Sequence, residues 1–163
     1  MPTPVIEQIA ERIRTIVSGV QTTNGYSTAI GTVLRPTRLP FRTEALGNLD
    51  AVITQGDKVR SEDNDLQGNP PAIAWVQPFE IAVASIRAES VTTALESDLN
   101  TIEADIQMAV MGDQQLQAMI VERHLGEPTQ EVTENGARGL VTVVVEIIYR
   151  VSEDDPYENR AGA

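Results

Sequence analysis

The sequence predicts an α+β fold: a two-layer sandwich in which two helices cover one face of a mainly antiparallel, five-stranded sheet. The clearest evidence is the stretch from Gly136 to Val151. From Val141 its residues alternate between a wholly apolar face and a partly polar face, which is typical of a long strand near the centre of a sheet. Two amphipathic helical patterns supply the second layer, and hairpin-type links between strands favour antiparallel pairing.

The first helical pattern lies at the N-terminus. Thr3 is placed to cap the helix, Pro4 suits its first position because that residue needs no N–H donor, and Gly19 ends it. The apolar positions repeat every three or four residues, at Val5, Ile6, Ile9, Ile13, Ile16, Val17 and Val20. This spacing predicts a helix with one buried face.

The second helical pattern begins at Thr92 or Thr93 and ends at Gly112. Its apolar stripe has similar spacing, at Leu95, Leu99, Ile102, Ile106 and Val110. The opposite face is acidic, at Glu96, Asp98, Glu103 and Asp105, which is typical of a solvated helix face. Both helices can therefore shield the same face of one sheet.

The five predicted strands are bounded by glycine, proline and polar residues, and they span residues 26–34, 49–55, 73–86, 119–125 and 136–151. Pro78 lacks an N–H donor, so it predicts an edge position or a bulge in the third strand. Asn135 and Gly136 favour a turn, so the last two strands are predicted to form a hairpin joined by a polar connection, residues 126–135. Residues 1–151 are predicted to form a single α+β domain. Residues 152–163 are predicted to form a mobile acidic tail.

Two long irregular segments, residues 35–49 and 56–71, are candidate contact surfaces, because long loops in compact domains usually carry function. The first contains three cations that we expect to bind an acidic partner: Arg35, Arg38 and Arg42. The second contains three acids: Glu62, Asp63 and Asp65. The Pro, Gly and polar content of both segments predicts that they are mobile until a neighbour binds.

The net charge of -12 is unevenly distributed. Residues 1–60 carry seven basic and five acidic side chains, whereas residues 61–163 carry five basic and nineteen acidic ones. Proteins bind nucleic acids by neutralising phosphates with Lys and Arg, so this balance argues against a DNA- or RNA-binding protein. No apolar run reaches the roughly 18 to 20 residues that a membrane span needs, and we expect a soluble protein.

No catalytic or metal-binding constellation stands out, and we predict neither enzymatic activity nor a cofactor. The chain has no cysteine, and His124 is the only histidine, so a zinc site or a catalytic triad cannot be completed. Asp63 and Asp65 match the start of a calcium loop, but the twelfth position, where a bidentate glutamate is needed, is Ala74. The GxxG pattern at residues 136–139 lies in a predicted hairpin, not between helices as in an RNA-binding KH domain.

The order of elements resembles the tail-terminator proteins (also called tail-completion, minor tail or neck proteins) of long-tailed bacteriophages. The shared features are an N-terminal amphipathic helix, an Arg35-Pro36 boundary, long middle loops, a second amphipathic helix, and a final strand that runs into Tyr149 and then Asp155-Pro156-Tyr157. The extended acidic loop at residues 62–65 is atypical, so the resemblance does not define the docking surface.

This resemblance implies a non-enzymatic subunit that assembles into a hexameric ring, caps the tail tube, ends tail polymerisation and joins the tail to the head connector. The implied partners are further copies of the chain, the tube protein and the connector, in a virion assembled in the host cytoplasm. DNA would pass through the ring without specific binding, repelled by an acidic lining at Glu62, Asp63 and Asp65; on the outer rim the same acids would serve solubility. Another neck, head-completion or tube ring protein stays open, as does a small ligand-binding domain or enzyme.

Overall fold

The computed structural model describes residues 1–35, 45–87, 92–133 and 137–162. Within these residues it is an α+β structure, as predicted, with three helices and a seven-stranded sheet. The helices are α1 (Val5–Ser18), α2 (Thr92–Gly112) and α3 (Gln114–Met119). The strands are β1 (Val33–Leu34), β2 (Ala51–Gln55), β3 (Val59–Arg60), β4 (Ala72–Ile86), β5 (Glu122–Leu125), β6 (Thr129–Val132) and β7 (Arg138–Ser152). The prediction of five strands and two helices was too small, because β3, β6 and α3 are too short to show a periodic pattern.

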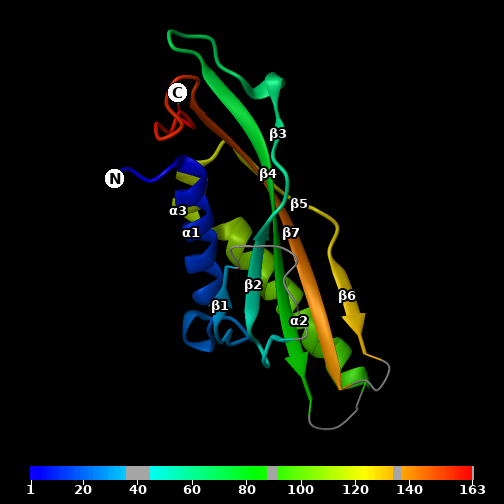
Figure 1. Cartoon of the computed structure of the whole chain (residues 1–163). Coiled ribbons are helices and arrows are strands. Elements are labelled where there is room, and N and C mark those ends of the chain that lie inside the picture. Colours follow the sequence, from blue (N-terminus) through cyan, green and yellow to red (C-terminus); the bar gives the residue numbers. More distant parts are fainter. Residues whose placement is uncertain (36–44, 88–91, 134–136, 163) are drawn as a thin grey trace.

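The strand order is β1-β2-β4-β7-β5, with β3 also paired to β4 and β6 also paired to β7. The sheet is mixed, because β1 runs parallel to β2 while the other pairs are antiparallel. β4 and β7 form its centre and pair along fifteen residues each, from Ala72 opposite Ser152 to Ile86 opposite Arg138. Figure 1 shows them as one long, twisted ribbon. The predicted central position of the last strand is confirmed.

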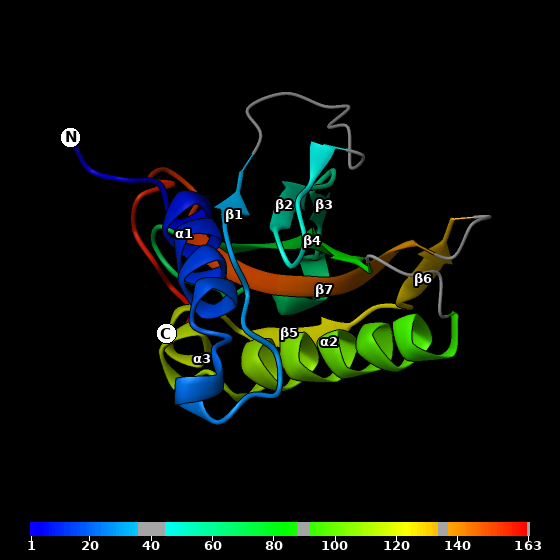
Figure 2. The ribbon, with the colours of Figure 1, turned by 90° about the horizontal axis from the view of Figure 1, so that it is seen from below.

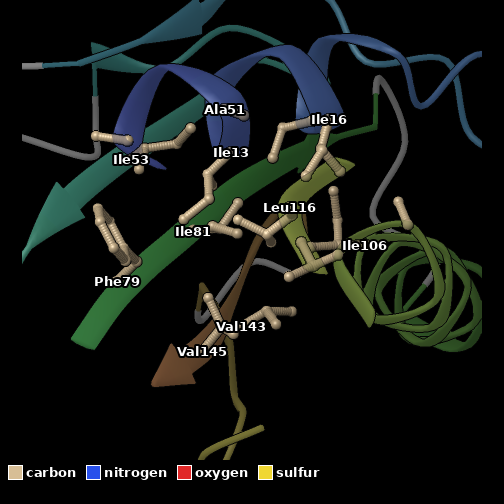
Figure 3. Packing of buried hydrophobic residues seen from close by; sticks show 14 of the residues in the cluster. Ile13, Ile16, Ala51, Ile53, Phe79, Ile81, Ile106, Leu116, Val143 and Val145 are labelled. Carbon is tan, nitrogen blue, oxygen red and sulfur yellow. The ribbon is translucent and has the colours of Figure 1, made fainter. Parts of the chain in front are cut away.

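The helices cover one face of the sheet (Figure 2), as predicted for α1 and α2. The close-up in Figure 3 shows Ile13 and Ile106 of these helices beside Ile81 and Val143 of the central strands, and all four are buried. Burying an aliphatic side chain of this size contributes about 1.5–3 kcal/mol, so this layer carries most of the stability of the fold. Among the described residues, the opposite face carries a smaller buried cluster, made of Leu46, Val52, Ala82 and Ala84.

Pro78 lies inside β4, in register with Glu146 of β7, so the predicted edge position was wrong. On its other side the partner changes from β2 to β3: Gln55 pairs with Phe79 and Val59 pairs with Val76, so three residues stand opposite two, and the bulge lies in the partner segment. Gly56 N–H donates to Pro78 O at 3.0 Å. Pro78 has no N–H with which to return this bond. The buried side chain of Gln77 supplies it instead, because its Nε2 donates to Gly56 O at 2.6 Å. A central proline is therefore tolerated through the side chain of its neighbour.

The predicted strand at residues 26–34 is confirmed only at β1. The preceding backbone groups are bonded elsewhere: Ile30 N–H donates to Val20 O after α1, and Thr32 N–H donates to the Asp50 carboxylate. This segment therefore runs past the end of α1 before it joins the sheet. At the other end of α1, Pro4 and not Thr3 occupies the N-cap position, and no side chain caps the helix.

The predicted strand at residues 119–125 begins only at Glu122, because α3 occupies the preceding residues. Asp113 caps this helix by accepting a hydrogen bond from Leu116 N–H at 2.6 Å, and Leu116 is fully buried. The antiparallel hairpin with the last strand is confirmed. β6, which lies within the predicted polar connection, extends the hairpin along β7.

Residues 153–162 fold back along the domain. Pro156 O accepts a hydrogen bond from Val5 N–H at 3.2 Å, and the Asn159 side chain donates to Met119 O at 2.9 Å. Asn159 also forms an isolated β-bridge with Val151. The mobility predicted for residues 152–163 stays a prediction, and these are bonds that such motion would break.

Candidate assembly surfaces

Arg35, the first predicted partner-binding cation, is held inside the domain. Its guanidinium donates to Glu7 Oε1 at 2.7 Å, to Glu11 Oε1 at 2.5 Å and to Gln55 Oε1 at 3.1 Å. The hydrogen bond with Arg35 holds the pKa of Glu7 below its usual value, and the same bond raises the pKa of Arg35. Only 19% of the Arg35 side chain is exposed. This residue therefore fastens α1 to the end of β2.

The other two predicted partner-binding residues, Arg38 and Arg42, lie outside the described residues. The part of their segment that the structure does describe is bonded to the sheet. Leu49 N–H donates to Ala84 O at 2.7 Å, and the Asn48 side chain accepts from Ile86 N–H at 2.9 Å. The partner-binding role of Arg38 and Arg42 stays a prediction.

A second ion pair, which the sequence analysis did not single out, joins α1 to the start of α3. Arg12 donates to Asp113 through Nε at 3.0 Å and through Nη2 at 2.5 Å. The hydrogen bond with Arg12 lowers the pKa of Asp113 and raises the pKa of Arg12. Arg123 of β5 donates to the carbonyl oxygens of Met111 and Asp113 at the same corner. The one available sequence signal was Asp113 itself, an acid of capping type directly after Gly112.

The acidic loop has two parts with different environments. Asp65 is half-buried, and its carboxylate accepts from Arg60 Nη2 at 2.7 Å and from Ala74 N–H at 2.7 Å, which ties the loop to β3 and β4. Glu62 and Asp63 are exposed at the 3₁₀ turn that follows β3. Of the three acids predicted to face a channel, these two present their carboxylates to solvent, and their place at a channel stays a prediction.

Metal-binding chemistry gains no support from the described residues. Their His, Asp and Glu side chains form no cluster of three or more that could hold an ion. Asp65, which matches the start of a calcium loop, is already paired with Arg60. His124 is exposed, and its Nε2 lies 3.0 Å from Glu122 Oε2. Within the same residues, no helix is long and apolar enough to cross a bilayer.

The glycine that ends the GxxG pattern has a packing role. Gly136 lies outside the described residues, while Gly139 is buried in β7 beneath α2. A Cβ added to Gly139 would lie 2.8 Å from Leu99 Cδ1. The absence of a side chain thus lets α2 approach the strand closely.

A groove of about 520 Å³ lies between α2 and the backbone near the ends of β1 and β4. Its polar lining includes Asn48, Ser85, Arg87, Asp98 and Thr101. Arg87 and Asp98 form a bidentate pair across it, with Nε–Oδ2 and Nη2–Oδ1 distances of 2.7 and 2.8 Å. The charged groups of the groove thus satisfy each other.

The face of the sheet away from the helices combines acids with half-buried apolar side chains. Glu80 and Glu146 are exposed near the middle of the ribbon, with Val76 and Val144 half-buried on the same face. β5 and β6 each pair only with β7 among the described strands, and every residue of β6 is exposed. Strand alternation placed Glu146 on this face, and the prediction that both helices shield one face of the sheet already left this face without a helix layer.

No protein-family model matches the chain, and no curated protein matches it either. Its function is therefore inferred from the sequence and the geometry described above.

Proposed function

We propose that this chain is a non-enzymatic structural subunit of a bacteriophage tail, a tail-terminator protein that forms a hexameric ring. The ring caps the tail tube, ends tail polymerisation and joins the tail to the head connector in the virion. Assembly takes place in the host cytoplasm. DNA passes through the ring without specific binding.

The observation that carries this proposal is the sheet with helices on one face only. Half-buried apolar side chains and exposed acids share its other face, and β6 is exposed along its whole length. Sheet faces normally need a covering layer, and open strand edges are templates for pairing with another chain. A subunit that is completed by its neighbours accounts for both features.

The order of the elements adds support. An N-terminal helix, α1, a second long helix, α2, and a long final strand, β7, follow each other in the chain. These are elements on which the resemblance to the family rests. Another neck or tube ring protein would share these features, since only its position in the particle distinguishes it from a terminator.

The test is the size and shape of the purified chain, alone and mixed with tail-tube protein, by mass photometry and negative-stain microscopy. We expect closed rings of one stoichiometry, and we expect their addition to stop tube growth at one end. Monomers under both conditions would exclude the ring. Rings that leave tube growth unchanged would favour another neck protein.

The groove beside α2 favours a second candidate, a small ligand-binding domain, because its volume is within the range of ligand sites and its lining mixes polar and apolar groups. A ligand that fills this groove would raise the melting temperature of the monomer. Asp98→Ala, which opens the Arg87 pair, should alter that shift if the groove is the binding site.

A further inference from the structure

The N-terminal and C-terminal segments meet near one end of the β4–β7 ribbon (Figure 1). A small pocket lies where they meet the two strands. Its volume is about 230 Å³, and most of its lining is apolar or aromatic: Pro4, Ile6, Ile73, Trp75, Tyr149 and Val151. Lys58 also lines it, with Nζ 4.5 Å from the centre of the Trp75 ring. We call this site the Lys58–Trp75 pocket. Ser152, Glu153 and Pro156 complete the lining, so the pocket combines an apolar hollow with one cation and one carboxylate.

Lys58 differs from the other described cations. Each described arginine bonds to a carboxylate or a backbone carbonyl of the domain, as Arg12, Arg35 and Arg150 illustrate. Lys58 is exposed and, among the described residues, has no carboxylate within ion-pair distance, although acids outnumber bases two to one in the chain. A cation left open beside an apolar hollow matches an apolar side chain that carries a carboxylate next to it.

Arg60 is a second cation beside the Trp75 ring. It lies in β3, two residues beyond Lys58, with its guanidinium carbon 5.5 Å from the centre of the same Trp75 ring. One of its nitrogens, Nη1, is buried without a hydrogen-bond partner. Two cations thus face one indole ring. Arg60 is already paired with Asp65, which leaves Lys58 as the cation of this ring that can bind a partner's carboxylate.

The chain has the complementary surface further along the ribbon. Residues 122–132, which include β5 and β6, expose Glu127 and Glu131 together with two apolar side chains, Leu125 and Val132. β6 pairs with residues 139–142 of β7, whereas the Lys58–Trp75 pocket touches residues 149–152. β5 lies between them, against residues 145–148. The β6 part of the edge, which carries Glu131 and Val132, therefore lies toward the other end of the ribbon from the pocket, as a head-to-tail contact requires.

We propose that the Lys58–Trp75 pocket binds the acidic edge, residues 122–132, of a second copy of this chain. The contact places an apolar side chain of the edge against Trp75 and a carboxylate of the edge beside Lys58. This inference rests on the proposed ring function, and it names the two surfaces that close the ring.

Charge reversal and recovery test the contact. Lys58→Glu, and separately the pair Glu127→Lys and Glu131→Lys, should each raise the concentration needed for half-assembly by about tenfold or more. The triple variant, with all three charges reversed, should recover assembly. Arg14→Glu is the matched control, because Arg14 is an exposed cation on α1 with the same change in charge. Unchanged melting temperatures would show that each variant folds.

Trp75 is the only tryptophan, so its fluorescence reports directly on the pocket. Its emission should shift to shorter wavelength on assembly of the wild type and return on dilution. If rings form but Lys58→Glu assembles as the wild type does, or Trp75 emission stays constant during assembly, the pocket is not the contact while the ring function stands.

A wild type that stays monomeric removes the ring function and leaves a separate test of the contact. A synthetic peptide of residues 122–133 is titrated into the monomer while Trp75 emission is measured. A saturable shift that is lost in Lys58→Glu, and lost with a peptide in which Glu127 and Glu131 are Gln, supports the contact. No shift at millimolar peptide overturns it.

Discussion

Two groups of cations differ in the partners that the fold gives them. On α1 and at its border with β2, Arg12 and Arg35 are saturated with carboxylates from other elements. Directly before β3, Lys58 contacts the Trp75 ring and has no carboxylate within ion-pair distance among the described residues. All three residues add one positive charge to the sequence. What separates a cation that holds the fold from one that is open to a partner is the set of acceptors that the fold brings to it.

The largest loss of stability should come from breaking the ion pair between Arg12 and Asp113. Asp113→Ala removes both the partner of Arg12 and the cap of α3, and we expect it to lower the unfolding free energy by about 2–3 kcal/mol. Urea denaturation followed by circular dichroism measures this. Asp98→Ala is the control, because it breaks an ion pair that is about one-third exposed and should cost less than about 1 kcal/mol. Equal losses in the two variants would contradict the distinction.

The second prediction compares one variant from each group, and both stability and assembly are measured for each variant. Arg35→Met leaves Glu7 and Glu11 without their partner, so it should lower stability by about 1–2 kcal/mol while assembly stays intact. Lys58→Met should do the reverse: stability changes by less than about 0.5 kcal/mol, and assembly weakens. Denaturation and mass photometry on the same preparations separate the two. An Arg35 variant that folds normally but fails to assemble would return it to the partner-binding set.

The long periodic elements could be predicted from the sequence, whereas the short strand and the pocket could not. Periodicity located α1, α2 and β7 because each repeats its pattern over ten or more residues. It missed β3, which has two residues and directly follows Lys58. The pocket is non-local as well, since its lining comes from both terminal segments, from Lys58 and from two strands, β4 and β7.

The partners of Arg35 and Pro78 could not be predicted from the sequence either. Arg35 looked available because it precedes Pro36 in an irregular segment, but the fold places it between two acids of α1 that are more than twenty residues earlier in the chain. Pro78 looked like an edge residue because its own N–H is missing. No sequence rule signals that the Gln77 side chain replaces that donor. In each case the deciding partner is set by tertiary packing.

The pH dependence of stability should also report on the carboxylates that pair with Arg12 and Arg35. The pKa values of Glu7 and Asp113 are lowered by their hydrogen bonds with Arg35 and Arg12. A carboxyl group with a lowered folded-state pKa contributes stability that is present above its unfolded pKa of about 4 and is lost as the pH falls through the folded value. Wild-type stability should therefore decline from pH 6 to pH 3.

Asp113→Asn isolates this contribution. The variant should be less stable than the wild type at pH 6. The gap should begin to narrow as the pH falls below about 4, because the carboxyl group of the unfolded wild type then binds a proton that the folded state disfavours. Thermal denaturation across this range measures the gap. A gap that stays constant with pH would mean that the charge of Asp113 does not contribute to stability and that the cap alone does.

The smallest effect on stability is expected in the acidic loop. Two of its acids, Glu62 and Asp63, are exposed, whereas Asp65 is paired with Arg60. Glu62→Lys with Asp63→Lys changes only exposed groups and should alter stability by less than about 0.5 kcal/mol, whereas Asp65→Lys also opposes Arg60 and should cost more. In a tail ring, lysines at 62 and 63 near the channel would attract DNA within about one Debye length, roughly 8–10 Å. The double variant should then bind DNA at low salt and slow its ejection from particles, while ring assembly is unchanged. If its rings show no affinity for DNA at low salt and particles eject normally, Glu62 and Asp63 lie on the outer rim and serve solubility.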